Sequence, residues 1–100
     1  MIVVRFKLRC RPEKAEQLKV AFGEVIAASR PLEGVISFDI GQDLSEADTF
    51  IGVEVFDDKA ALDRQESLPV TQRTIGLLGE AVVGDLEATI YHVSSSEPWG

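Results

Sequence analysis

The chain has 100 residues, 45% of them hydrophobic, and a formal net charge of -7. This length fits one domain over residues 1–100, with a core at about residues 2–93 and a short polar tail at residues 94–100. The acidic balance and the lack of a Lys/Arg cluster argue against nucleic acid as a partner. No apolar run approaches the roughly 20 residues that span a bilayer, and the single cysteine, Cys10, excludes an internal disulfide. We therefore expect a reduced, cytoplasmic protein without membrane contact.

The first predicted elements are a strand and a long helix. Residues 2–10 alternate between apolar and basic side chains, which is typical of a strand with one buried face. Pro12 suits the first turn of a helix, and we expect that helix to end near Arg30, before Pro31. The residues that recur at helical spacing within it are Leu18, Phe22, Val25, Ile26 and Ser29.

Two strands follow as an antiparallel hairpin, at residues 34–43 and 49–56, because turn-forming residues separate two alternating runs. In the first strand we expect Ile36, Phe38 and Ile40 on one face. In the second strand one face carries Ile51, Val53 and Val55, and the other carries Phe50, Gly52, Glu54 and Phe56.

The rest of the chain predicts two helices and a last strand. Asp57 or Asp58 is a candidate N-cap for a short helix, and Pro69 begins a second helix that we expect to stop at Gly84. Residues 86–93 form the last strand. This order predicts an α+β, ferredoxin-like βαββαβ fold, with an antiparallel sheet and helices on one face.

The second apolar row of the sheet predicts a homodimer. Helices on one face leave the row of Ile51, Val53 and Val55 uncovered, and an exposed apolar patch of this kind is rare on monomers. We expect a second copy to pack its sheet against this one. A monomer with an exposed apolar sheet face is the alternative.

Glu54 is the main candidate for chemistry. It lies between phenylalanines on the strand face that we expect to turn toward the helices, where Gly52 leaves space for a small-molecule cavity. Burial there would raise its proton affinity toward neutral pH, as a general base requires. A structural role is the alternative, in which Glu54 pairs with an arginine or caps a helix.

Other candidates have similar alternatives. Gln65 lies at a helical spacing that can face the same cavity, or it is solvated or locally bonded. His92, the only histidine, is either a polar contact near a strand end or a structural residue, and no other strong donor is spaced to join it at a metal. Cys10 is a small core residue or a reactive thiol. No phosphate-binding, zinc or serine-hydrolase motif occurs, so we expect no metal.

With these elements in order, the stretches "EGVISFDIGQD" and "FIGVEVFDDKAAL" resemble the antibiotic biosynthesis monooxygenase family of dimeric α+β barrel proteins. The resemblance covers about residues 2–93. It rests on the strand with Phe38, on Glu54 and Phe56 at the end of the next strand, and on the helix that begins after two aspartates.

The resemblance implies a homodimer whose two sheets close face to face. For the members that are enzymes, it also implies oxygenation of electron-rich aromatic substrates, such as hydroquinones, without a metal, flavin or haem cofactor. Many members carry histidines where this chain has Gln65 and Val70. Polyketide-tailoring relatives address their substrate from the positions of Gly52, Phe56 and Leu62.

The candidate residues and the family resemblance together predict two alternative functions. The first is a cofactor-independent monooxygenase that acts on an aromatic or hydroquinone-like small molecule, with Glu54 as the base or orienting acceptor. Its substrate-binding residues would be Phe22, Phe38, Phe56, Leu62, Gln65 and His92. The second is a non-catalytic small-molecule-binding or stress-associated dimeric protein on the same scaffold, which the departures from the family's polar residues favour.

Overall fold

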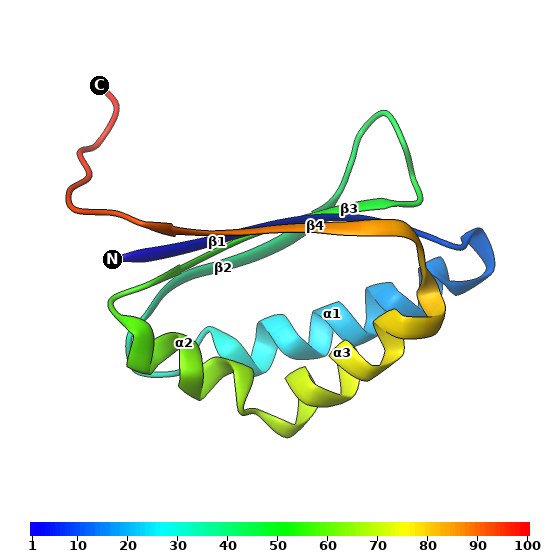
Figure 1. Cartoon of the computed structure of the whole chain (residues 1–100), viewed down its shortest axis with the longest axis horizontal. Helices are drawn as coiled ribbons and strands as arrows, with labels where there is room; N and C mark the ends of the chain where they lie inside the picture. The colour runs from blue at the N-terminus through cyan, green and yellow to red at the C-terminus, as the bar shows by residue number, and fades with distance from the viewer.

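The computed structural model describes all residues 1–100 and places the helices on one side of a four-stranded sheet (Figure 1). The elements in chain order are β1 (Ile2–Cys10), η1 (Pro12–Lys14), α1 (Ala15–Ser29), β2 (Val35–Gln42), β3 (Thr49–Phe56), α2 (Lys59–Glu66), α3 (Pro69–Ala81) and β4 (Val82–His92). The strand order is β2-β3-β1-β4, and each neighbouring pair is antiparallel. The predicted ferredoxin-like α+β fold is confirmed. No helix has the length and hydropathy needed to cross a membrane.

The core lies between the sheet and the helices in two clusters. One joins β1, α1, β2, β3 and α2 through Ile2, Val25, Phe38, Phe56, Ala61 and Leu62. The other joins β1, α1 and β3 through Leu8, Cys10, Leu18, Phe22 and Phe50. Cys10 is fully buried there, as a small core residue, and burial raises the pKa of its thiol. The alternation predicted for β1 and β3 therefore places the expected faces toward the helices.

The predicted face of β2 is wrong at its beginning. Val35 pairs with Phe56, and Ser37 pairs with the adjacent Val55, so Ile36 is the extra residue of a β-bulge. Val35 consequently packs against the core, whereas Ile36 is 53% exposed. A strict period of two could not anticipate this change of side.

The boundary between α3 and β4 also differs from the prediction. The helix ends at Ala81, and β4 begins at once with Val82. Gly84 has a φ of 72° and lies within β4, where the register with β1 shifts between Lys7 and Arg9. Its positive φ serves this irregularity in the strand rather than a helix stop.

Gly52 makes room for a neighbouring side chain rather than for a ligand. A Cβ atom on Gly52 would lie 2.0 Å from Cε2 of Phe6, its cross-strand partner on β1. The Phe6 ring therefore occupies the space beside Gly52 that we expected to belong to the cavity. Its centroid lies 5.9 Å from the centroid of the Phe22 ring. Any side chain at position 52 would displace this ring.

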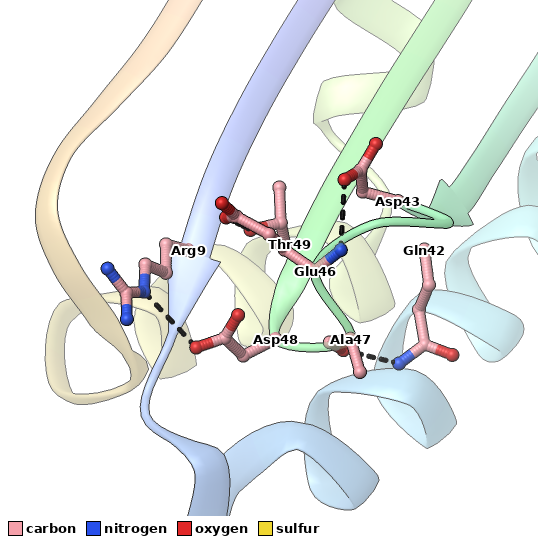
Figure 2. Close-up of polar contacts among 7 residues, drawn as sticks. All are labelled: Arg9, Gln42, Asp43, Glu46, Ala47, Asp48 and Thr49. Atoms are coloured by element: carbon pink, nitrogen blue, oxygen red, sulfur yellow. Dashed lines mark hydrogen bonds and ion pairs between the residues drawn. The ribbon is translucent and has the colours of Figure 1, made fainter.

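The β2–β3 connection is held by its own polar contacts (Figure 2). The Asp43 carboxylate accepts hydrogen bonds from the backbone N–H groups of Ser45 and Glu46, at 3.2 and 3.0 Å. Arg9 of β1 forms an ion pair with Asp48 at 3.1 Å. The two bonds to Asp43 shape the turn itself, as the turn-forming composition predicted, and the ion pair attaches the turn to β1.

The sheet face opposite the helices is partly apolar. Val53 in β3 is 38% exposed, and Ile51 and Val55 on either side of it are half-buried. Nearly all of β4 is exposed, including Tyr91 opposite Val3. No helix covers this face of the sheet (Figure 1).

Candidate functional site

A cavity of about 290 Å³ lies between the helix-facing side of the sheet and the three helices. Its lining residues are Val4, Phe6, Phe22, Val25, Phe38, Ile40, Glu54, Gln65, Glu66, Thr71, Thr74, Ile75, Leu78, Leu86 and Ala88. Ile75 of α3 and Leu86 of β4 are 50% and 41% exposed, so the cavity opens to solvent between these two elements. Its size suits a small ring compound.

Glu54 is the polar group that the sheet contributes to this cavity. It is paired across the sheet with Val4 of β1 and Phe38 of β2, whose side chains share its face and also line the cavity. Burial raises the pKa of Glu54 from 4.5 to about 7, and repulsion from the Glu66 carboxylate adds to this shift. Glu54 neither pairs with an arginine nor caps a helix, so the predicted structural alternative has no support in its contacts.

Gln65 is the polar group that α2 contributes. It is only 2% exposed, and its amide nitrogen donates to Ser29 Oγ of α1 and to Thr71 Oγ1 of α3, each at 3.1 Å. Asp58 fixes the start of α2 by accepting from the backbone N–H of Ala61 at 2.9 Å. Gln65 therefore lines the cavity, and it is locally bonded rather than solvated. Its role in binding stays a prediction.

The structure brings only some of the predicted site residues together. Phe22 and Phe38 line the cavity with Glu54 and Gln65. Phe56 and Leu62 lie in the core and are absent from the lining. His92 is exposed at the end of β4 and does not reach the cavity.

Sequence reasoning missed the contributions of α3 and β4. Thr71, Thr74 and Leu78 line the cavity from α3, and Leu86 and Ala88 line it from β4. A signal for Thr71 was present, because a buried glutamine needs hydroxyl or carbonyl partners and Thr71 follows Gln65 closely in the chain.

The structure offers no candidate metal site. No group of three or more His, Cys, Asp or Glu side chains is placed to hold a metal ion. The only charged residues in the cavity lining are Glu54 and Glu66. The arrangement can accept a proton or a hydrogen bond from a small ligand in apolar surroundings.

Solved structures share this fold over nearly the whole chain. A protein of Deinococcus radiodurans, provisionally named an antibiotic biosynthesis monooxygenase, is 24% identical, and the match covers 100% of this chain and 99% of that one with a TM-score of 0.87. Rv0793 of Mycobacterium tuberculosis is 18% identical, with 97% and 98% covered and a TM-score of 0.86. SO0527 of Shewanella oneidensis is 25% identical, with 92% and 89% covered and a TM-score of 0.82.

Sequence comparison points the same way. The uncharacterized protein sll1783 of Synechocystis is 26% identical over 96 residues, and the chain spans 65% of the length of that curated relative. The family model described as antibiotic biosynthesis monooxygenase matches residues 1–76. The chain therefore belongs to the antibiotic biosynthesis monooxygenase family.

Proposed function

We propose that the protein is a cofactor-independent monooxygenase that acts on an aromatic, hydroquinone-like molecule bound beside Glu54. The observation that carries this proposal is an unpaired carboxyl group with a pKa of about 7 in a mainly apolar cavity of about 290 Å³. Such a group can remove a proton from a bound phenol near neutral pH. Membership of the family supports the reaction class.

The proposed chemistry needs no reductant besides the substrate. Glu54 takes the proton of a phenolic hydroxyl, and the resulting electron-rich anion transfers one electron to O₂. Recombination of the two radicals forms a C–O bond at a ring carbon that carries hydrogen. Loss of water from this ring peroxide breaks the O–O bond. The balance is hydroquinone plus O₂ giving hydroxyquinone plus water, in which the ring supplies all four electrons.

The protein contributes surroundings and orientation in this scheme. Phe22 and Phe38 offer apolar surface to an aromatic ring, and Phe6 closes the cavity floor on the β1 side. Exclusion of water from the ring protects the radical pair from side reactions. Fixing the ring against Glu54 replaces a bimolecular proton transfer by one within a complex.

We expect the protein to consume oxygen when it is given a panel of substituted hydroquinones in air-saturated buffer. The measurement is oxygen uptake above the rate without protein, together with the mass of the product after reaction under isotopically labelled O₂. The product should carry one labelled oxygen atom and two fewer hydrogens. A hydroquinone that raises the melting temperature without any labelled product would instead indicate the non-catalytic binding function.

We also propose that the protein forms a homodimer through the sheet face opposite the helices. The exposed Val53 and its half-buried neighbours Ile51 and Val55 support this, because they form an apolar row along β3 that no helix covers. Sedimentation velocity at micromolar concentration should give twice the chain mass of 10.9 kDa. Val53→Lys should produce monomers, whereas Val20→Lys on the exposed surface of α1 should not. A wild-type species of single-chain mass would contradict the proposal.

A further inference from the structure

The cavity lining has no positively charged side chain. The lining contains two carboxylates, Glu54 and Glu66, one amide, Gln65, and the hydroxyl groups of Thr71 and Thr74. No arginine, lysine or histidine is among the lining residues. A negatively charged ligand group would find no opposite charge in this cavity.

Gln65 contributes an acceptor rather than a donor. Its amide nitrogen has two hydrogens, and these are used by Ser29 Oγ and Thr71 Oγ1 at 3.1 Å each. Ser29 is fully buried and Thr71 is 7% exposed, so water does not compete for these bonds. The atom of Gln65 that stays available to a ligand is therefore the carbonyl oxygen, Oε1.

The nearby helix ends and basic side chains do not add positive charge to the cavity. The C-terminal end of α2, at Glu66, and the N-terminal end of α3, at Pro69, meet beside the cavity, and their dipoles have opposite signs there. The cations of α2 are engaged elsewhere: Lys59 pairs with Asp63 at 3.0 Å, and Arg64 donates to the Glu33 carbonyl at 3.0 Å. The side chains of the lining therefore decide the charge of the cavity.

We infer that the cavity selects its ligand by charge and hydrogen-bond polarity: it takes a neutral or cationic aromatic molecule with donor groups and rejects carboxylated or phosphorylated analogues. This inference rests on the proposed function for the aromatic nature of the ligand, and it narrows the substrate class. An anionic substituent would lose its hydration without gaining a cation, and it would face Glu54 and Glu66. A hydroxyl or ammonium group can instead donate to Gln65 Oε1 or to a carboxylate.

The test uses three hydroquinones that carry a methyl, a carboxylate or an aminomethyl group at the same ring position. Binding to the full chain is measured by isothermal titration calorimetry under argon at about pH 8, so that no turnover is needed. We expect the methyl and aminomethyl compounds to bind and the carboxylate to bind at least about tenfold more weakly. Equal binding of the carboxylate and methyl compounds would overturn the inference, as would a lack of binding by all three.

A lysine placed in the lining should reverse the selection. Leu86 of β4 lines the cavity and is 41% exposed, so the Leu86→Lys side chain can keep its ammonium group hydrated at the rim. This variant should bind the carboxylate about tenfold more tightly than the wild type does. Val20→Lys is the matched control, because Val20 is 63% exposed on α1 and lies outside this cavity.

The control separates local charge from the net charge of the chain. If Val20→Lys improves binding of the carboxylate as much as Leu86→Lys does, the general repulsion by a net charge of -7 explains the selection and the inference fails. Oxygen uptake is a separate readout. Charge selection without oxygen uptake would contradict only the proposed reaction, and oxygen uptake with equal binding of all three compounds would contradict only the present inference.

Discussion

Glu54→Gln should lose most oxygen uptake on hydroquinones, by about 10²- to 10⁴-fold, because glutamine keeps the shape of the side chain but accepts no proton. In the wild type the rate should rise with pH through about 7, as Glu54 ionises and becomes a base. Stopped-flow or electrode measurements of oxygen uptake between about pH 5 and pH 8 check both expectations. An equal rate in the two proteins would show that Glu54 is not the base.

The same substitution should stabilise the fold at high pH. Below about pH 4.5 the Glu54 carboxyl is protonated in both the folded and the unfolded chain. As the pH rises from 4.5 to about 7, the unfolded chain loses this proton while the folded chain keeps it, so the free energy of unfolding falls. The loss amounts to about 3 kcal/mol above pH 7. Glu54→Gln should therefore be more stable by about that amount at pH 8 and little changed at pH 4.

Urea unfolding at the two pH values measures this effect, and Glu97→Gln in the exposed tail is the control with the same change of charge. The two readouts of Glu54→Gln distinguish the roles of this residue. Stabilisation with loss of activity supports a buried base. Stabilisation with full activity would mean that Glu54 is buried but does not take part in the reaction, and no stabilisation would contradict the raised pKa.

The position of Glu54 could be predicted from the sequence, whereas its surroundings could not. Alternation along residues 49–56 was enough to place Glu54 on the same face as Phe50 and Phe56, and the structure agrees. Alternation does not say which residues of that face pack into the core and which border a cavity. Phe56 packs against Ala61 and Leu62 of α2, whereas Glu54 borders the cavity. This difference depends on where the helices cross the sheet.

Local departures from regular geometry explain the other differences. The bulge at Ile36 and the irregularity at Gly84 each move residues from one face or element to another, and both depend on pairing with a neighbouring strand. Gly52 was correctly singled out, but the side chain that needs its space is Phe6 from the adjacent strand. Such a contact between strands distant in sequence has no signature in a single strand's pattern.

Gln65→Met should destabilise the protein by about 2–3 kcal/mol, although methionine matches glutamine in length and flexibility. The reason is that the substitution leaves the buried hydroxyls of Ser29 and Thr71 without their donor. Gln72→Met is the matched control: Gln72 also donates a hydrogen bond, to the Glu66 carbonyl at 2.7 Å, but it is exposed and water can replace its bond. We expect a loss below about 1 kcal/mol for this control.

A combined variant decides whether the cost at Gln65 comes from the unpaired hydroxyls. Ser29→Ala with Thr71→Val removes both acceptors while nearly keeping their volumes, so adding Gln65→Met to this pair should cost less than Gln65→Met alone by about 1–2 kcal/mol. Urea unfolding of the four proteins measures this coupling. Additive losses would mean that the amide holds α1, α2 and α3 together by packing rather than by its hydrogen bonds. In that case the amide would be free to turn, and Gln65 could present a donor as well as an acceptor to the cavity.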